Sequence, residues 1–272
     1  MSETVIALSD VRKSYGKHQV LSGVNMQVNK GDIYGLIGKN GAGKTTIFKI
    51  ILGLSEFSGG SLSIMGGSTP KNIAAGRRHI GFFIGSNFFP KMDAAQNLAY
   101  YCQMKGIKNP KEEIERVLKI VGLHGVKNKV GRFSMGMKQR LGIANAILGN
   151  PEILILDEPA NGLDPQGIVD VRNLVKRLNE EYGMTVIVSS HILSELQNTA
   201  TRFGIVNNGM VACEITTEDL EKMERAVRIS VDDLDLAREA LEKAGVKVLD
   251  VQHESSSLEA FYFNLVGGDN DA

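Results

Sequence analysis

Residues 38–45 read GKNGAGKT and match the pattern G-x-x-x-x-G-K-[ST]. A mostly apolar run, residues 32–37, precedes this stretch, and residues 45–54 follow it with helical spacing. Glycines allow the backbone to wrap closely around a phosphate chain, and the following helix adds the positive end of its dipole. Lys44 can then reach the outer phosphates of a nucleoside triphosphate, and the Thr45 hydroxyl can bind Mg²⁺. The stretch predicts a nucleotide phosphate site between a strand and a helix.

Other apolar runs indicate the fold around this loop. Residues 153–156 and 185–188 are largely apolar on both faces, which is typical of central strands in a parallel sheet that helices cover on both sides. Near the start, residues 5–8 and 24–28 are strand-like runs separated by a polar loop that contains Gly16. We expect an α/β fold with a parallel sheet at its core and an N-terminal antiparallel β subdomain.

The region between the loop and the second core strand is helical in character. Asn109 and Pro110 supply an N-cap and an N1 proline, and apolar residues at helical spacing continue to about Gly122. Residues 93–104 and 137–148 also have helical spacing. These patterns predict a helical insertion at about residues 88–148.

The sequence changes character again after Cys213, and we expect a boundary between residues 215 and 216. Residues 226–231 and 246–251 resemble strands on either side of a charged helix at residues 234–244. A final apolar stripe consists of Leu258, Phe261 and Leu265. Residues 1–215 should therefore form the main domain, with a small α+β extension at residues 216–272.

The predicted strand at residues 153–156 ends in two carboxylates, Asp157 and Glu158. In a parallel sheet, ligands bind at the carboxyl ends of the strands, so both carboxylates should face the same phosphates as Lys44. Asp157 is suited to hold Mg²⁺, and Glu158 can accept the proton of a water that attacks the γ-phosphate. The alternative for these two residues alone is a strand that ends in solvated acids.

Composition excludes several classes of protein. The chain has 31 Lys+Arg and 31 Asp+Glu, and this zero net charge argues against nucleic acid as a main partner. Its apolar runs are far shorter than the roughly 18 residues that a membrane-spanning helix needs. Residues 1–4 lack the charge order of a signal peptide, and Cys102 and Cys213 lack metal-ligand spacing. A reducing, cytosolic setting is expected, with both thiols as packing side chains.

Residues 133–140 read FSMGMKQR and resemble the signature motif of the ATP-binding-cassette (ABC) ATPases, which usually contains LSGGQ. The chain departs from LSGGQ at three of its five positions but keeps Ser134 and Gly136. By itself an S-x-G pattern indicates a helix cap. The resemblance implies that the Ser134 hydroxyl and the backbone amides at a helix N-terminus close on the γ-phosphate that the other subunit holds.

Further motifs follow in the order of that family. Residues 161–164 read NGLD and resemble its D-loop, and His191 resembles its switch histidine, which hydrogen-bonds the γ-phosphate. Tyr15, 23 residues before Gly38, resembles the aromatic residue that stacks on adenine. The resemblance covers roughly residues 4–215. It implies catalytic roles for Lys44, Glu158 and His191, metal binding by Thr45 and Asp157, and ATP binding by a larger set: Tyr15, Gly38, Lys39, Asn40, Gly41, Ala42, Gly43, Lys44, Thr45, Thr46, Ser134, Gly136 and Asp164.

One position departs from the family. Residues 80–85 align with a segment that usually ends in a glutamine, which contacts Mg²⁺ and senses the membrane partner, whereas this chain has Gly85. Either Ser86, Asn87 or a water takes over the contact, or the enzyme is a slower or differently coupled ATPase. We favour the first interpretation.

Taken together, the motifs predict the ATP-hydrolysing subunit of a membrane transporter, peripheral to the cytoplasmic side of the membrane. The expected partners are a second copy or a closely related cassette, and a separate transmembrane permease. Residues 38–41, 134–144 and 161–165 resemble the bacterial subgroup that exports bacitracin-like and lantibiotic peptides. Two alternatives are a soluble ABC ATPase without a membrane partner and a P-loop small-molecule kinase, which would not need Ser134 or His191.

Overall fold

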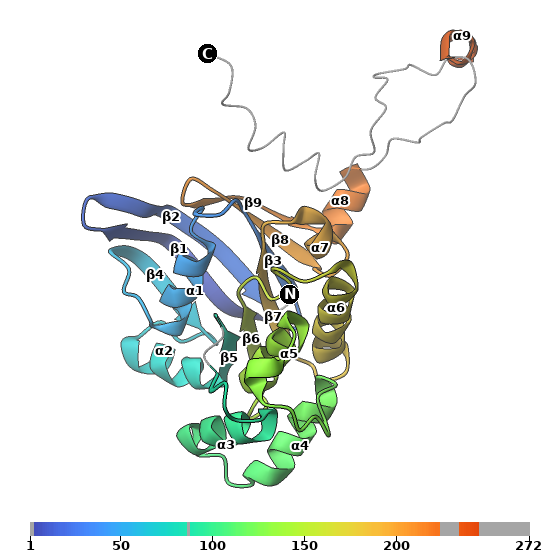
Figure 1. Ribbon diagram of the computed structural model, residues 1–272. Coiled ribbons are helices and arrows are strands. Elements are labelled where there is room, and N and C mark those ends of the chain that lie inside the picture. The colour runs from blue at the N-terminus through green and yellow to red at the C-terminus, as the bar shows by residue number, and fades with distance from the viewer. Residues whose placement is uncertain (1–2, 86–87, 224–233, 245–272) are drawn as a thin grey trace. The chain divides into compact units, whose positions relative to one another are not determined.

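The computed structural model describes residues 3–85, 88–223 and 234–244 (Figure 1). The chain divides into two compact units, Met1–Thr217 and Glu218–Ala272, which are considered separately. All the predicted site residues belong to the first unit.

The first unit contains a three-stranded antiparallel sheet with the strand order β2-β1-β4. Its bounds are β1 Thr4–Tyr15, β2 His18–Asn29 and β4 Gly59–Ile64. The turn between β1 and β2 contains Gly16, whose φ is 58°. The predicted antiparallel hairpin is confirmed, with strands longer than its apolar runs and with β4 as an additional strand.

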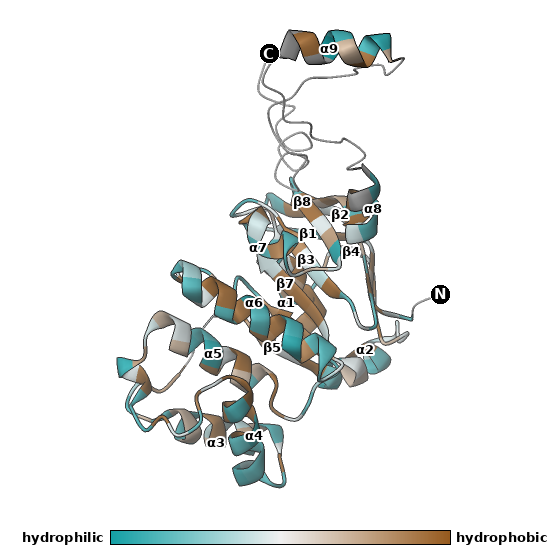
Figure 2. Ribbon diagram, turned by 90° about the vertical axis from the view of Figure 1, so that its right-hand side faces the viewer, coloured by the Kyte–Doolittle hydropathy of each residue, from teal (hydrophilic) through white to brown (hydrophobic). Residues whose placement is uncertain are grey.

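The second sheet is six-stranded, with the order β5-β6-β7-β3-β8-β9, and only β9 is antiparallel to its neighbour. Its bounds are β3 Ile33–Ile37, β5 Ile80–Phe83, β6 Ile153–Leu156, β7 Thr185–Ser190, β8 Arg202–Asn207 and β9 Met210–Thr216. Every residue of β3, β6 and β7 is buried, as the continuous apolar runs require. Figure 2 shows β3 and β7 mostly in brown, the colour of hydrophobic residues.

A hydrophobic core joins residues of both sheets with the helices α1 and α2. Phe48 of α1 is fully buried in a cluster that contains residues of β1, β2, β3 and β6. A Cβ at Gly142 would overlap the ring of Phe83, so glycine is what lets α5 lie against β5. The helices outside the insertion are α1 Lys44–Leu52, α2 Pro70–Gly76, η1 Arg77–His79, α6 Pro165–Glu180 and α7 Leu193–Gln197.

The helical insertion is present as predicted, with bounds that differ by a few residues. Asp93 begins the first helix with a capping box, in which its carboxylate accepts from the backbone N–H of Gln96. Pro110 occupies the first turn of the next helix. The insertion contains α3 Ala94–Lys105, α4 Pro110–Ile120, η2 Val130–Arg132 and α5 Met135–Ala146.

In the second unit, the helix predicted at residues 234–244 is present as α9, Leu234–Lys243. A short helix, α8 Thr217–Met223, starts at the boundary between the units. The predicted strands at residues 226–231 and 246–251 and the stripe of Leu258, Phe261 and Leu265 lie outside the described residues.

Candidate active site

The glycine-rich loop follows β3 and leads directly into α1. Gly43 is the N-cap of α1 with a φ of 112°, and a Cβ there would lie 2.7 Å from Cδ2 of Leu21. A Cβ at Gly38 would lie 2.6 Å from the carbonyl oxygen of Val206. Both positions therefore require glycine. Among the described side chains, none caps α1, so its first backbone N–H groups are available to an anion.

Lys44 is the buried cation of this loop, with only 4% of its surface exposed. Its Nζ donates to the carbonyl oxygen of Gly38 at 2.6 Å and to that of Lys39 at 3.2 Å. The same Nζ lies 3.2 Å from Oε1 of Glu158. Lys39, Asn40 and Gly41 are exposed at the tip of the loop. The loop thus surrounds one desolvated positive charge.

Asp157, the first residue after β6, contacts two hydroxyl groups. Oγ1 of Thr45 donates to its Oδ2 at 2.7 Å, and Oγ of Ser189 donates to its Oδ1, also at 2.7 Å. The two predicted metal ligands, Thr45 and Asp157, are therefore in direct contact. A hydroxyl and a carboxylate are hard oxygen ligands of the kind that Mg²⁺ prefers, so this pair fits the predicted ion.

Glu158 lies between a lysine and a histidine. Its Oε1 pairs with Lys44, and its Oε2 lies 3.1 Å from Nδ1 of His191. Nδ2 of Asn161 donates to the same Oε2 at 3.3 Å. The backbone φ of Glu158 is 48°, which is uncommon for a residue with a side chain, and its N–H donates to Oγ of Ser189 at 2.9 Å.

Sheet order explains why these residues meet. In the second sheet β7 lies between β6 and β3, and all three strands are parallel. Their carboxyl ends therefore share one edge of the sheet, where β3 supplies the loop, β6 the two carboxylates and β7 the residues that lead to His191. Of the predicted site residues, the structure brings together Lys44, Thr45, Asp157, Glu158 and His191.

Tyr15 ends β1 and is 49% exposed. Its hydroxyl lies 3.2 Å from Oγ of Ser55, and Nζ of Lys13 lies 4.7 Å from the centre of its ring. Lys13 makes a cation–π contact with this exposed ring. The adenine contact of Tyr15 stays a prediction, as do the nucleotide contacts of Ala42 and Thr46.

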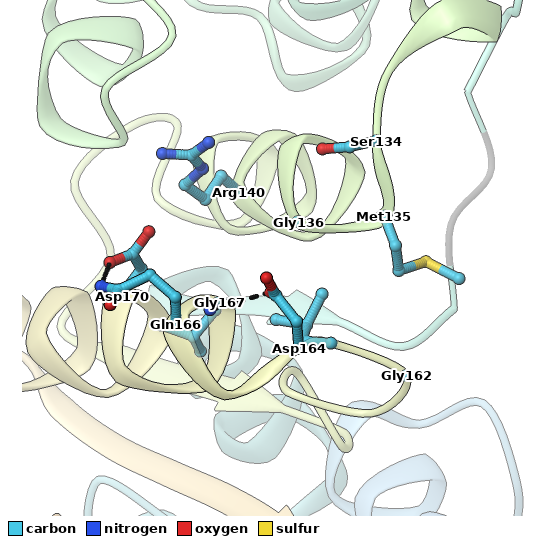
Figure 3. A pocket seen from close by; sticks show the side chains of 11 residues that line it. Ser134, Met135, Gly136, Arg140, Gly162, Asp164, Gln166, Gly167 and Asp170 are labelled. Atoms are coloured by element: carbon cyan, nitrogen blue, oxygen red, sulfur yellow. Dashed lines mark hydrogen bonds between the residues drawn. The ribbon is translucent and has the colours of Figure 1, made fainter.

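Ser134 and Gly136 lie in a different hollow, a cavity of about 320 Å³ between the starts of α5 and α6 (Figure 3). Ser134 is the N-cap of α5, and its Oγ accepts from the N–H of Met137 at 3.3 Å. Asp164 is the N-cap of α6, and its Oδ1 accepts from the N–H of Gly167 at 3.1 Å. None of the residues 38–45 lines this cavity. Within one copy, Ser134, Gly136 and Asp164 therefore do not join the cluster around Lys44.

Gly85 follows β5 and has a φ of 67°, and a Cβ there would meet nothing within 4 Å. Steric crowding therefore does not explain the glycine, although its backbone conformation favours one. Ser86 and Asn87, which could substitute for the family's glutamine, lie outside the described residues.

Sequence reasoning missed three side chains that contact this site. They are Ser189, which bonds Asp157 and Glu158; Asn161, which bonds Glu158; and Gln139, whose Nε2 donates to the carbonyl oxygen of Asn161 at 3.4 Å. Asn161 and Gln139 lie within the quoted motifs at residues 161–164 and 133–140, whereas the signal for Ser189 was only that two serines end a largely apolar strand. In the part of the chain that the structure describes, no helix is both long and apolar enough to cross a bilayer.

Comparison with known proteins gives similar sequences over most of the chain. The family described as ABC transporter matches residues 21–161. The bacitracin transport ATP-binding protein BcrA of Bacillus licheniformis is 36% identical, over 97% of this chain and 98% of that protein. The lantibiotic transport ATP-binding protein SrtF of Streptococcus pyogenes is 39% identical, over 81% of this chain and 94% of that protein.

One solved structure is described as the dimeric structure of a post-hydrolysis state of the ATP-binding cassette MJ0796 bound to ADP and Pi. It is 27% identical, with a TM-score of 0.69, and the match covers 78% of this chain and 98% of that chain. The family match includes residues 38–45, Ser134, Asp157 and Glu158, whereas Tyr15, Asp164 and His191 lie outside residues 21–161.

Proposed function

This chain belongs to the ABC transporter family and hydrolyses ATP, and from that premise we propose that it powers a bacterial exporter of peptide antibiotics or similar compounds. The observation that carries the ATPase part of the proposal is the contact of Lys44, Glu158 and His191 at one edge of the parallel sheet. A buried lysine beside a carboxylate and a histidine can hold a phosphate and position a water for attack.

Each residue of the cluster has a proposed role. The backbone of residues 38–45 and Lys44 bind the β- and γ-phosphates, and Thr45 with Asp157 would hold Mg²⁺, which neutralises phosphate charge when bound. A γ-phosphate would replace Glu158 as the partner of Lys44. The freed Glu158 carboxylate then accepts the proton of the attacking water, and His191 orients that carboxylate and the γ-phosphate.

We propose a nucleotide-sandwich dimer of two copies or of closely related cassettes. Ser134 and Gly136 line a cavity that is not lined by the phosphate loop of the same copy. Ser134 and Gly136 would therefore bind the γ-phosphate of a nucleotide that the phosphate loop of a second copy holds, with the two copies placed head to tail. The dimeric MJ0796 cassette, which is similar over 78% of this chain, supports this arrangement.

A separate membrane permease is the proposed second partner, which would place the chain at the cytoplasmic face of the membrane. Exposed apolar side chains lie on α3 and on the loop before it, where Phe89 is 40%, Tyr100 43% and Met104 69% exposed. The rings of Phe89 and Tyr100 pack edge to face with centres 4.9 Å apart. Buried Asn97 bonds both the N–H and the carbonyl oxygen of Phe89, so this loop is held rigidly. Such a surface suits an apolar partner.

The proposed cargo rests on the relatives alone. BcrA and SrtF are described as bacitracin and lantibiotic transport proteins, and the first aligns with this chain over nearly its full length. The residues of the site would bind and hydrolyse ATP whichever compound is transported, so the choice of cargo belongs to the permease.

Affinity purification of the tagged chain from its native membranes tests the proposal. We expect a hydrophobic permease to co-purify, and the Met104→Ala variant to retain much less of it because an exposed docking side chain is lost. Met210→Ala is the matched control, since Met210 on β9 is also exposed, at 44%. Purification of the chain without any membrane protein would contradict the transporter assignment and favour a soluble ABC ATPase.

A further inference from the structure

We propose that Ser189 is a positioning residue for ATP hydrolysis, because its hydroxyl holds the backbone of Glu158 in the conformation that aims the carboxylate. The proposal rests on the role of Glu158 as the proton acceptor. Ser189 is the penultimate residue of β7 and is fully buried.

The hydrogen bonds of Ser189 have a defined direction. A serine hydroxyl has one proton to donate and can accept with its lone pairs. Its proton goes to Oδ1 of Asp157 at 2.7 Å, and its oxygen accepts from the N–H of Glu158 at 2.9 Å. A carboxylate can only accept, so Asp157 fixes the rotation of the hydroxyl and leaves its lone pairs for Glu158.

The backbone of Glu158 needs such an acceptor. β6 ends at Leu156, and the next N–H, that of Asp157, still bonds the carbonyl oxygen of Phe83 at 2.9 Å. At Glu158 the chain turns into the left-handed region, with a φ of 48°, and leaves the sheet. This conformation is unfavourable for a residue with a Cβ and persists only where neighbouring contacts hold it. Ser189 supplies the bond that a strand neighbour would otherwise supply.

The neighbouring serine shows that this contact is specific to one position. Oγ of Ser190 donates to Oε2 of Glu195 and accepts from the N–H of Ile192. Successive side chains in a strand point to opposite faces. Of the two serines, only Ser189 therefore lies on the side of β7 from which the Asp157 carboxylate and the Glu158 N–H are reached.

The first test is Ser189→Ala, which removes one oxygen from a buried position. We expect kcat to fall about tenfold, as for the loss of one hydrogen bond that orients a charged group. The Kd for ATP should stay within about twofold, because Lys44 and the loop remain. Thr185→Val is the matched control, since the Thr185 hydroxyl is also buried on β7 and accepts from the N–H of Gly31, but at the opposite end of the strand. A kcat for Ser189→Ala equal to that of Thr185→Val would overturn the proposal.

A double-mutant cycle with Glu158→Gln separates positioning from a general packing effect. If Ser189 acts through Glu158, adding Ser189→Ala to Glu158→Gln should lower the single-turnover rate by no more than about twofold. A full tenfold loss in that background would show that the hydroxyl acts independently of Glu158 and would refute the inference. Near-normal turnover of Glu158→Gln alone would instead refute the proposed role of Glu158, so the two failures are distinguishable.

Discussion

Glu158 illustrates how a single side chain obtains its orientation from several parts of the sequence. Oε1 contacts Lys44 of the phosphate loop, and Oε2 contacts His191, the residue after β7. Asn161, three residues further along, adds a bond to Oε2. When a γ-phosphate takes Lys44, His191 and Asn161 can still hold Oε2, and a proposed proton acceptor needs this fixed position to align a water with the γ-phosphate.

Glu158→Gln should leave ATP binding intact and lower ATP turnover by about 10² to 10⁴, the range for removal of a positioned base. Glutamine keeps the shape and the hydrogen-bonding oxygen of Glu158 but cannot take a proton at neutral pH. Fluorescent-nucleotide binding and phosphate release measure the two effects. Glu152→Gln, a similar change at a half-exposed glutamate paired with His79, should leave turnover unchanged. Near-normal hydrolysis in the Glu158 variant would contradict the assignment.

The helical insertion is attached to the core through the carboxyl end of α5. Lys105 of α3 donates to the carbonyl oxygens of Asn145 and Leu148, and Arg116 of α4 donates to that of Ile147. Positive charges stabilise a helix at this end, where the last carbonyl groups lack helical partners. α3 and α4 therefore share one anchor on α5, the helix that begins with Ser134.

Glu113 completes this anchor from α4. Its Oε1 accepts from Gly149 N–H and from Arg116, each at 2.7 Å, and Oε2 accepts from Nε of Arg116 at 2.8 Å. The hydrogen bonds from Arg116 hold the pKa of Glu113 below its usual value. Glu113→Gln should lower the free energy of unfolding by about 1 to 3 kcal/mol at neutral pH. Urea unfolding followed by circular dichroism measures this.

The same substitution predicts a pH dependence. The pKa of Glu113 is lowered in the folded state. Its contribution to the free energy of unfolding is therefore fully present above the unfolded pKa of about 4.3 and is lost as the pH falls through the folded-state pKa. The difference in free energy of unfolding between wild type and Glu113→Gln should therefore shrink as the pH falls below about 4.3. Glu115→Gln is the control: Glu115 makes an exposed pair with Lys119, so the substitution should have almost no effect at any pH. A constant difference down to strong acid would refute the ionic anchor.

Across the first unit, the two parts of the proposed ATP site lie at separate places. The cavity at Ser134 and the smaller pocket at Glu158 and His191 have only Gly162 and Leu163 in common, from the turn between β6 and α6. This turn also touches α5, because Gln139 bonds the carbonyl oxygen of Asn161. Asn161 in turn bonds Glu158, so hydrogen bonds connect α5 to the Glu158 carboxylate through this turn.

Ser134→Arg should prevent ATP-dependent dimerisation, because a large cation would fill the cavity where the phosphate of a second copy is expected. Multi-angle light scattering with ATP, in the Glu158→Gln background that retains the nucleotide, measures the effect. We expect a monomer, with ATP binding to Lys44 preserved. Ser68→Arg, at an exposed turn before α2, should dimerise normally. Undiminished dimerisation of the Ser134 variant would exclude the shared site.

Much of the fold and part of the site were predictable because the signals are local. The apolar runs of β3, β6 and β7 required burial on both faces, and Pro110 marked a helix start because proline suits the first turn. β4 was not predicted, because its six residues carry only a short alternating pattern. Ser189 was missed for a different reason, since nothing in its sequence surroundings tells which face of β7 meets the carboxylates.

The sequence by itself determined the phosphate loop, the acidic strand end and the family, because each depends on residue types at short, fixed spacings. Only the tertiary structure decided that β7 lies between β6 and β3. This strand order brings the Ser189 hydroxyl to Oδ1 of Asp157 and to the N–H of Glu158. It also decided that Ser134 lies outside the cluster at Lys44. Strand order and helix placement arise from packing between distant segments, and no local pattern encodes them.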